Sequence, residues 1–291
     1  MAIPTIADYP MPQPESFPAN KTKWQPSAER AVLLIHDMQR YFLRYYDAGG
    51  KLLPRLIENL AGLRAWAREN AVPVIYTAQP HDQPAADRAL LNDMWGPGLT
   101  VADPTLQEVV AELAPAAEDT VLTKWRYSAF QRSDLLDRMR AWGRDQVVIG
   151  GVYAHIGCMV TAVDAFMNDV QPFLVGDAVA DFSEAEHRMA LQYVATRCGA
   201  VIDTASLANG PRQETTRNWL QARVLQLIED EDETEVDPDE NLIFYGLDSL
   251  QVMKLAGELK ERGISVGFDE LARVPTLNGW WTLIEEKRLA A

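Results

Sequence analysis

The sequence predicts an α/β protein with a doubly wound, mostly parallel sheet of six strands and helices on both faces, followed by a small all-α helical bundle. Over the first two-thirds of the chain, short apolar runs alternate with amphipathic stretches of helical period, which is typical of a parallel sheet. Beyond the turn-rich segment Ser206–Pro211, helical patterns continue without a convincing strand. We therefore expect two domains, at residues 1–210 and 211–291.

Six apolar runs of strand length make up the predicted sheet. Each run is bounded by turn residues or by a stretch of helical period. The runs are Ala31–Ile35, Val72–Thr77, Thr120–Thr123, Gln146–Gly150, Pro172–Val175 and Ala200–Ile202.

The segments between these runs predict the helices that cover the sheet. Lys51–Glu69 places its leucines on one face at helical spacing. Ser183 and Glu186 form a capping-box pattern, which predicts that a helix begins there. Further helices are expected near Leu106–Leu113 and at Val160–Met167.

The C-terminal domain is expected to contain helices and acidic loops. The run Glu229–Glu240 is rich in acidic residues, and we interpret it as a solvated loop. The helical patterns are Asn218–Ile228, Ser249–Arg262 and Leu277–Lys287.

Charge and hydropathy exclude several classes of function. The chain has 27 Lys and Arg residues against 42 Asp and Glu residues, a net charge of −15 at pH 7. Nucleic-acid binding needs a basic face, so we expect no nucleic-acid partner. The longest apolar runs have the length of a strand, and the first 23 residues lack the pattern of a signal peptide. We expect a cytoplasmic protein that does not enter a membrane.

Metal and disulfide chemistry are also not indicated. Two cysteines, Cys158 and Cys198, are too few for a disulfide framework or a four-thiolate zinc site. Of the four histidines, His36 and His155 lie near strand ends, but no carboxylate–histidine spacing joins them. We expect no catalytic metal.

Polar side chains follow four of the predicted strands, at the point where each strand ends. Asp37, Gln79 and Lys124 follow the first three strands, and Tyr153–Gly157 follows the fourth. Singly, an aspartate there is usually a helix cap and a lysine is usually solvated. In a doubly wound sheet, however, ligands bind outside the carboxyl ends of the strands, where these groups converge. The pattern therefore indicates an active site at this edge.

Five motifs around these positions resemble, in order, those of the isochorismatases, which belong to the wider superfamily of cysteine hydrolases. The resemblance covers residues 3–207. It implies an enzyme that hydrolyses the enolpyruvyl ether of isochorismate to pyruvate and 2,3-dihydro-2,3-dihydroxybenzoate. The motifs are Ile35–Gln39, Tyr76–Pro80, Leu91–Gly98, Lys124–Phe130 and Gly151–Cys158.

The chain departs from the Asp–Lys–Cys triad of that superfamily at the third position. Asp37 and Lys124 occupy the first two positions, but Gly157 stands where the nucleophilic cysteine is expected. Cys158 is the next residue, and one residue along a helix turns a side chain by about 100°. We interpret Cys158 as a buried packing residue. Without a thiolate there is no covalent intermediate, so hydrolysis of amides or nitriles is disfavoured.

The resemblance implies how the proton is delivered. Asp37 is the general acid, and Phe42 and Trp95 are expected to form an apolar wall that raises its pKa. A neighbouring Lys124 ammonium would lower that pKa. We expect a substrate carboxylate to pair with Lys124 and Arg88 and so to relieve Asp37 of its cationic neighbour.

The remaining predicted roles concern space and orientation. Gln79 and Tyr153 orient the substrate by hydrogen bonds, and Gly157 leaves room beside it and offers a backbone N–H. We therefore assign catalysis to Asp37, Lys124 and Gly157, and substrate binding to Phe42, Gln79, Arg88, Trp95 and Tyr153.

A second candidate site lies in the C-terminal domain at Ser249. Asp248 and Ser249 before an amphipathic helix would, taken alone, be a helix N-cap. Within Gly246–Leu250, in an acidic helical unit, they resemble the modification motif of carrier domains, and Val274–Leu277 with a tryptophan pair is similar to aryl carrier domains of siderophore assembly lines. This resemblance covers residues 213–288 and implies 4′-phosphopantetheine attached covalently to Ser249. A helix N-terminus favours the incoming phosphate.

The two resemblances together imply the partners. They are isochorismate, a phosphopantetheinyl transferase, a ligase that adenylates 2,3-dihydroxybenzoate, and a condensation or cyclisation domain of a nonribosomal peptide synthetase. Leu250 and Met253 are expected to be exposed apolar anchors of the docking face. We also expect a homodimer formed through the first domain.

Two other interpretations of the function stay open on the sequence alone. A cysteine-type amidohydrolase fused to a carrier domain would need a cysteine at the position of Gly157. A carrier scaffold with an inactive lyase domain would be expected to have a damaged pocket.

Overall fold

The chain forms two compact units, residues 1–210 and 211–291, each with its own hydrophobic core. The computed structural model describes residues 3–209, 215–228, 236–262 and 264–290. The acidic run that starts at Glu229 lies outside the described residues as far as residue 235. No described helix is long and apolar enough to cross a membrane.

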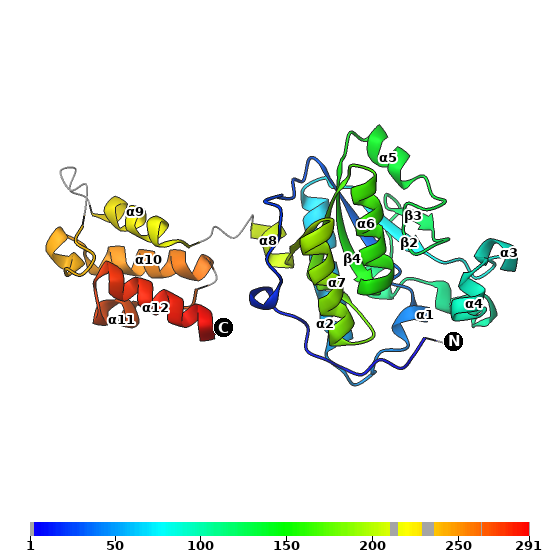
Figure 1. The fold of residues 1–291 in the computed structure, drawn as a ribbon, viewed down its shortest axis with the longest axis horizontal. Coiled ribbons are helices and arrows are strands. Elements are labelled where there is room, and N and C mark those ends of the chain that lie inside the picture. Colours follow the sequence, from blue (N-terminus) through cyan, green and yellow to red (C-terminus); the bar gives the residue numbers. More distant parts are fainter. Residues whose placement is uncertain (1–2, 210–214, 229–235, 263, 291) are drawn as a thin grey trace. The chain divides into compact units, whose positions relative to one another are not determined.

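The first unit is built on a six-stranded sheet in which all paired strands are parallel (Figure 1). The order across the sheet is β3-β2-β1-β4-β5-β6. The predicted doubly wound α/β fold is therefore confirmed. The strands are β1 (Ala31–His36), β2 (Val74–Ala78), β3 (Thr120–Thr123), β4 (Gln146–Val152), β5 (Gln171–Ala180) and β6 (Ala200–Ile202).

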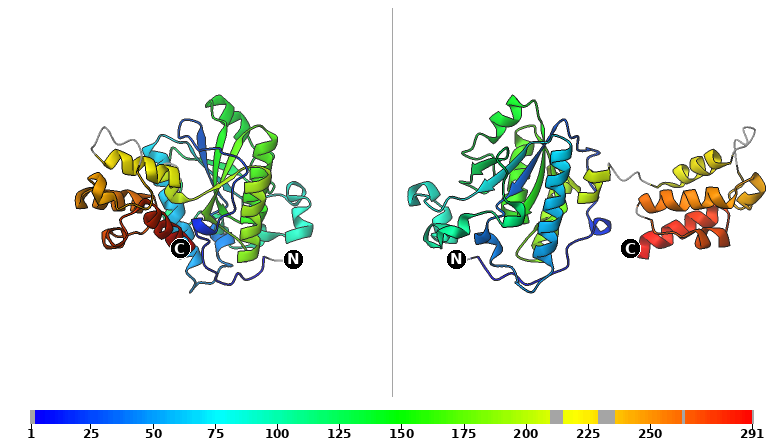
Figure 2. Two further views of the ribbon diagram at one scale, coloured as in Figure 1. Left: turned by 60° about the vertical axis from the view of Figure 1, so that its left-hand side comes forward. Right: turned by 180° about the vertical axis from the view of Figure 1, so that it is seen from behind.

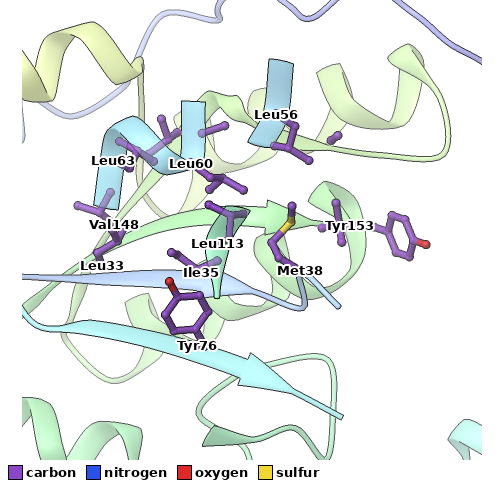
Figure 3. Packing of buried hydrophobic residues seen from close by; sticks show 14 of the residues in the cluster. Leu33, Ile35, Met38, Leu56, Leu60, Leu63, Tyr76, Leu113, Val148 and Tyr153 are labelled. Atoms are coloured by element: carbon purple, nitrogen blue, oxygen red, sulfur yellow. The ribbon is translucent and has the colours of Figure 1, made fainter. Parts of the chain in front are cut away.

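Helices cover both faces of the sheet, because successive side chains of a buried strand point to opposite faces. In β1, Leu33 and Ile35 pack in the cluster of α2 (Leu52–Glu69), whereas Val32 and Leu34 pack in the opposite cluster. Figure 3 shows leucines of α2 against Leu33 and Ile35. α8 (Thr204–Asn209) lies on the α2 side, and the other side holds α5 (Leu135–Ala141), α6 (Met159–Met167) and α7 (Glu184–Arg197) (Figure 2).

The chain changes direction across the sheet at β1. This central strand pairs with β2 on one side and with β4 on the other. The segment after β1 leads to α2 on one face, and the segment after β4 leads to α6 on the other face. The carboxyl ends of β1 and β4 therefore border the crevice in which doubly wound sheets bind ligands.

The helix expected near Leu106–Leu113 is replaced by two short 3₁₀ turns, Pro104–Gln107 and Ala111–Leu113, so that prediction was wrong. The backbone between these turns is hydrogen-bonded to another segment of the chain. The Arg40 N–H donates to the Glu108 carbonyl, and the Val110 N–H donates to the Met38 carbonyl. Hydrogen bonds to the segment after β1 thus take the place of an intrahelical ladder.

The second unit is a small helical bundle, as predicted. Its core includes Leu220, Leu255, Leu271 and Trp280, all fully buried. A short 3₁₀ turn, Leu242–Tyr245, precedes the helix that begins at Ser249. The helices are α9 (Arg217–Leu227), α10 (Ser249–Glu261), α11 (Phe268–Arg273) and α12 (Leu277–Ala290).

Candidate active site

A cavity lies at the carboxyl ends of the strands. It draws its walls from the segments after β1, β2, β3 and β4, as the sequence predicted. It is lined by all eight residues that we assigned to the pocket, which are Asp37, Phe42, Gln79, Arg88, Trp95, Lys124, Tyr153 and Gly157.

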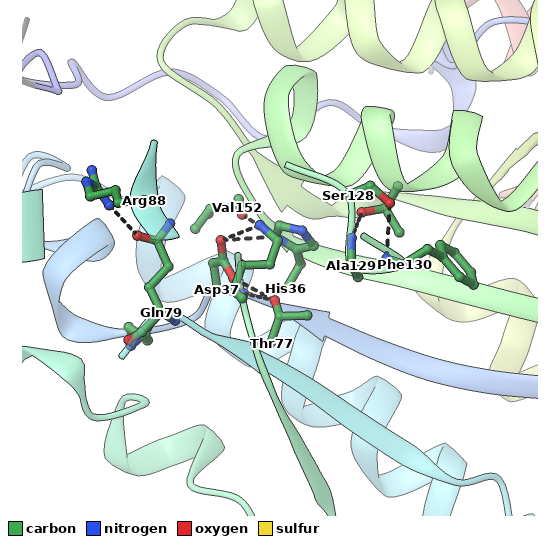
Figure 4. A network of polar contacts seen from close by, with 12 residues as sticks. His36, Asp37, Thr77, Gln79, Arg88, Ser128, Ala129, Phe130 and Val152 are labelled. Atoms are coloured by element: carbon green, nitrogen blue, oxygen red, sulfur yellow. Dashed lines mark hydrogen bonds and ion pairs between the residues drawn. The ribbon is translucent and has the colours of Figure 1, made fainter. Parts of the chain in front are cut away.

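Asp37 is held at the cavity by three polar contacts (Figure 4). Its Oδ2 atom is 3.0 Å from the Lys124 Nζ atom, and its Oδ1 atom accepts a 2.6 Å hydrogen bond from the Thr77 hydroxyl. The Asp37 N–H in turn donates to the Thr77 hydroxyl oxygen at 3.1 Å. Asp37 directly follows β1 with φ of 50°, a left-handed conformation that is uncommon outside glycine. The end of β1 therefore fixes the position of the carboxylate.

Burial and charge act on Asp37 in opposite directions. Burial raises the pKa of its carboxyl group, but the Lys124 ammonium and the Thr77 hydroxyl, with a contribution from His36, bring the pKa below its ordinary value. Without substrate, Asp37 is therefore ionised near neutral pH. The lowered pKa is the effect expected from the neighbouring Lys124 ammonium, and Phe42 and Trp95, the predicted apolar wall, both line the cavity.

Arg88 brings a buried positive charge to the wall of the cavity. It ends the short helix α3 (Ala85–Arg88) and is 4% exposed. Its Nε atom donates to the Gly96 carbonyl at 3.0 Å, and Nη1 donates to the Gln79 side-chain oxygen at 3.3 Å. Among the described residues, no carboxylate lies within 4.0 Å of it. A buried cation without a counter-ion is costly, so this guanidinium is prepared for an anionic ligand.

Tyr153 offers the cavity its ring rather than its hydroxyl group. The hydroxyl donates a 2.7 Å hydrogen bond to the Phe42 carbonyl. Its ring packs edge-on against Phe182, with centroids 4.5 Å apart, and both rings line the cavity. The predicted hydrogen bond from Tyr153 to substrate would require this internal bond to break.

Gly157 lies against the imidazole of His36. A Cβ atom added at Gly157 would be 2.0 Å from Cε1 and 2.7 Å from Nε2 of His36. The space beside this glycine is thus filled by a side chain of the protein. This corrects the expectation that Gly157 leaves room for substrate.

Comparison with known proteins identifies both units. Residues 31–206 match the isochorismatase domain, and residues 218–284 match the phosphopantetheine attachment site. The chain belongs to the isochorismatase family. Enterobactin synthase component B of Escherichia coli (strain K12) is 47% identical over 287 residues, 99% of each chain. The isochorismatase of Bacillus subtilis (strain 168) is 45% identical over 300 residues, 98% of this chain and 96% of that one.

Solved structures show the same fold in the first unit. A cysteine hydrolase from Pseudomonas syringae pv. phaseolicola superposes with a TM-score of 0.58 at 25% identity, covering 66% of this chain and 96% of that chain. An isochorismatase family protein from Desulfovibrio vulgaris superposes with a TM-score of 0.53 at 26% identity, covering 62% of this chain and 96% of that chain.

The thiol nearest to the cavity of this isochorismatase unit is a packing residue. Cys158 is fully buried and belongs to the core cluster on the α6 side of the sheet. Burial raises the pKa of its thiol well above the ordinary value, so it is not a thiolate at neutral pH. It also does not line the cavity. The interpretation of Cys158 as a structural residue agrees with this placement.

Sequence reasoning did not single out several residues that line the cavity. Arg126 stands two positions after Lys124 inside a motif that we quoted, and its Nη1 atom donates to the Asp87 carbonyl of α3 at 2.9 Å. Phe182 follows the carboxyl end of β5. The strand extends five residues beyond its predicted end at Val175. A search for side chains that directly follow the predicted strands, which found Asp37, therefore could not find Phe182.

Three side chains outside the cavity could together approach a metal ion. The ligand atoms of His155, Asp181 and Glu186 lie within 4.8 Å of one another. Asp181, however, already accepts three hydrogen bonds, from both the backbone and the ring of His155 and from the Phe182 N–H. We assign this group a structural role in joining the ends of β4 and β5.

Ser249 is placed where a modifying enzyme can reach it. It is exposed and is the first residue of α10, and Asp248 caps the helix in a reciprocal capping box with Gln251. The free N–H groups of this first turn suit a phosphate ester on the serine, so the residues fit the phosphopantetheine that the family match indicates. Leu250 and Met253 are 74% and 52% exposed, as expected for docking anchors.

Proposed function

We propose that the first unit hydrolyses isochorismate to pyruvate and 2,3-dihydro-2,3-dihydroxybenzoate, and that the second unit carries 2,3-dihydroxybenzoate as a phosphopantetheine thioester for siderophore assembly. The names of the two full-length relatives, an isochorismatase and a component of enterobactin synthase, support this pairing. One observation supports the reaction most directly. A buried Asp37–Lys124 pair faces the cavity, and Gly157 takes the position of a nucleophile.

The charges around the cavity suit a substrate with two carboxylates. The lining residues include three cations, Arg88, Lys124 and Arg126, and one anion, Asp37. This excess of positive charge sits within a chain whose net charge is −15. Isochorismate is a dianion, because it carries one carboxylate on the ring and one on the enolpyruvyl group. We therefore place its carboxylates against these cations, with Arg88 as the first counter-ion.

Substrate binding changes the protonation of Asp37. A substrate carboxylate beside Lys124 and Arg88 neutralises the charge that keeps the pKa of Asp37 low. Burial then dominates and favours the protonated acid. Phe42, Trp95 and Phe182 keep bulk water away from the carboxyl group.

The reaction then proceeds by proton transfer without a covalent intermediate. Protonated Asp37 gives its proton to the terminal methylene of the enol ether, which leaves an oxocarbenium ion. Water adds to this cation and returns one proton to the Asp37 carboxylate. The hemiketal then collapses: its hydroxyl proton moves to the ether oxygen that the ring carries, the bond between that oxygen and the hemiketal carbon breaks, and pyruvate is released. One water molecule is consumed, and Asp37 is ready for another cycle.

The second unit is proposed to act with a synthetase. Phosphopantetheine bound to Ser249 would supply a thiol for the aryl thioester. A phosphopantetheinyl transferase, a 2,3-dihydroxybenzoate-adenylating ligase and a condensation or cyclisation domain are its proposed partners. Leu250 and Met253 on α10 and Phe244 before it, which is 78% exposed, provide the apolar contacts for docking.

A homodimer of the first unit remains part of the proposal. Phe166 and Met167 end α6, and Met189 and Tyr193 lie on the neighbouring helix α7; all four are between 42% and 74% exposed. A contact between two copies could cover these side chains. Analytical ultracentrifugation of the full chain tests this, with a dimer mass expected and a monomer mass at high concentration contradicting it.

The two other readings find less support. An amidohydrolase needs a reactive thiolate, but Gly157 and the buried Cys158 leave none at Asp37 and Lys124. An inactive scaffold is expected to have a damaged pocket, yet the acid, the cations and the cavity are all in place.

Pyruvate release is the direct test of the proposed reaction. Purified protein is mixed with isochorismate, and pyruvate is followed by a coupled lactate dehydrogenase assay. We expect turnover in the wild type and in Cys158→Ala, and no loss after treatment with iodoacetamide. Absence of pyruvate would refute the proposed reaction, and loss of turnover in Cys158→Ala with an unchanged melting curve would restore a thiol mechanism.

A further inference from the structure

His36 and Gly157 occupy adjoining space that cannot hold two side chains. As described above, a methyl group at residue 157 would lie 2.0 Å from Cε1 and 2.7 Å from Nε2 of the His36 ring, and also 2.9 Å from Nδ1. Non-bonded carbon atoms normally stay about 3.5–4.0 Å apart. A side chain at position 157 and the present position of the His36 ring are therefore mutually exclusive.

The His36 ring has no room to withdraw. It is fully buried, and its Nδ1 atom is 2.9 Å from the Val152 carbonyl, to which it donates. The backbone behind it is also fixed, because His36 pairs with Gly151 of β4. A Cβ atom at Gly151 would lie only 2.2 Å from the His36 carbonyl oxygen, which shows how closely the two strands approach.

The turn that carries Gly157 is equally fixed. It lies in the π-helical turn Ala154–Cys158, in which the N–H groups of Ile156 and Cys158 both donate to the Tyr153 carbonyl. Cys158 anchors the turn in the core cluster. A larger residue at position 157 must therefore displace His36 rather than the turn.

Displacement of His36 would be transmitted to the acid. His36 immediately precedes Asp37, and its Nδ1 atom is 3.6 Å from the Asp37 Oδ2 atom. The Asp37 carboxylate depends on a 3.0 Å contact with Lys124 and a 2.6 Å contact with Thr77. A shift of about 1 Å would break this geometry, and errors of that size typically cost about a hundredfold in rate.

We infer that His36 is a positioning residue for Asp37 and that its ring excludes every side chain, a nucleophilic thiol included, from position 157. The inference rests on the proposed hydrolysis of isochorismate and names the residue that commits this site to chemistry without a covalent intermediate. The His36–Gly157 pair then acts as a unit. A glycine is needed at position 157 because histidine is present at position 36.

A double-mutant cycle tests this inference. His36→Asn is the matched substitution, because the asparagine amide can still donate to the Val152 carbonyl while Cε1 and Nε2, the two atoms nearest to the added methyl group, are removed. We compare wild type, Gly157→Ala, His36→Asn and the double variant by melting temperature and by kcat and KM for pyruvate release. Residues in direct contact are expected to show non-additive effects.

Gly157→Ala alone is expected to lower kcat at least about tenfold and to lower the melting temperature. KM should change less, because Arg88 and Gln79 lie on other elements of the pocket. In the His36→Asn background, adding Gly157→Ala should lower kcat and the melting temperature by clearly less than it does in the wild type, because only the contact at the former Nδ1 position, 2.9 Å, is left.

The control background is His187→Asn. His187 is also a fully buried histidine with a carbonyl partner, Gly176, but the three atoms nearest to a Cβ atom added at Gly157 all belong to His36. Gly157→Ala should be as damaging there as in the wild type.

Equal losses in the His36→Asn and wild-type backgrounds, or a harmless Gly157→Ala, would overturn the inference. If Gly157→Ala alone does not fold, recovery of folded protein in the double variant is the supporting result and no recovery is the contrary one. The melting temperatures show whether His36 and Gly157 interact even if the wild-type protein releases no pyruvate. Failure of the proposed function can therefore be told apart from failure of this inference.

Discussion

Asp37 is the residue on which the proposed chemistry depends, and two opposed influences set its protonation. Burial favours the neutral acid, whereas Lys124 at 3.0 Å favours the carboxylate. In the ligand-free protein the charge prevails. The substrate brings its own carboxylates, so the balance is expected to reverse only when the site is occupied.

Asp37→Asn is predicted to abolish pyruvate release without unfolding the protein. The amide keeps the shape of the side chain and can accept the Thr77 hydrogen bond, but it has no acidic proton to deliver. Positioned proton transfer is typically worth about 10²–10⁴-fold. The kinetics of pyruvate release measure the loss of activity, and a thermal melt of the same sample shows whether the variant is folded. Turnover within a fewfold of wild type would remove Asp37 from the mechanism.

The residues that line the site could be predicted from the sequence, but the space around Gly157 could not. Asp37, Gln79 and Lys124 could be found because each follows a strand, and parallel strands deliver their ends to one edge. The reason for Gly157 could not be found, because the His36 ring approaches it through folding and no local spacing encodes that contact.

At the level of elements, the strands and long helices could be predicted from the period of their apolar residues. Segments whose conformation depends on hydrogen bonds to distant parts of the chain could not be predicted in this way. β3 and β6 coincide with the predicted runs, since apolar residues there are bounded by clear breaks. β5 continues to Ala180, because Gly176 and Asp177 interrupt the apolar pattern without ending the strand. The turns at 104–113 depend on hydrogen bonds to residues 38–40, which the local sequence does not reveal.

The short helix α3 is held over the cavity by two arginines, and this permits a matched comparison. Arg126 and Arg132 both donate to the Asp87 carbonyl, at 2.9 and 3.1 Å, but only Arg126 lines the cavity. We predict that Arg126→Gln raises KM for isochorismate by about tenfold or more, as expected for loss of a hydrogen bond to a charged group. Arg132→Gln should change KM less than about twofold. Equal effects of the two substitutions would mean that Arg126 acts only by holding α3.

His187 joins α7 to β5 and makes the stability of the first unit depend on pH. Burial lowers its pKa from 6.5 to about 4. Between these values the unfolded chain binds a proton that the folded protein does not, so the free energy of unfolding falls as pH drops from about 6.5 towards 4. The full effect is about 3 kcal/mol for one such histidine. His36 adds to the same window, because burial also lowers its pKa to about 4.

Replacing His187 therefore should flatten the acid side of the stability curve. Urea unfolding of wild type and His187→Gln is measured at several pH values between 4 and 7. We expect the variant to be less stable at pH 7, because the bond to the Gly176 carbonyl is altered, but to lose less stability on acidification. Parallel curves for the two proteins would show that His187 does not bind its proton in this window.

At the scale of the whole chain, the two units are expected to act independently. Among the described residues, those that line the cavity lie between Ile3 and Phe182, and Ser249 lies in a unit with its own core. The product of hydrolysis must also be oxidised to 2,3-dihydroxybenzoate before it can be loaded. A separate dehydrogenase is therefore required between the two reactions, and direct transfer between the sites is not expected.

Ser249→Ala is predicted to eliminate arm attachment and to leave pyruvate release unchanged. Treated with coenzyme A and a phosphopantetheinyl transferase, the wild type should gain the mass of one arm. Ser265→Ala is the matched control, because Ser265 is another exposed serine of the same unit. Intact-protein mass spectrometry reads attachment, and the coupled assay reads hydrolysis. An arm on Ser249→Ala would disprove the site, and a large loss of pyruvate release would disprove independence.

In the proposed reaction an acid of the protein protonates the terminal methylene of the enol ether, and the origin of the hydrogen that this carbon gains can be followed with deuterium. The reaction is run in D₂O, pyruvate is reduced to lactate as it forms so that later exchange is prevented, and the methyl group is analysed by mass spectrometry. Asp37 exchanges its proton with solvent, so one deuterium is expected in the methyl group. A methyl group without deuterium would mean that the hydrogen comes from a carbon of the substrate, and that result would contradict the mechanism.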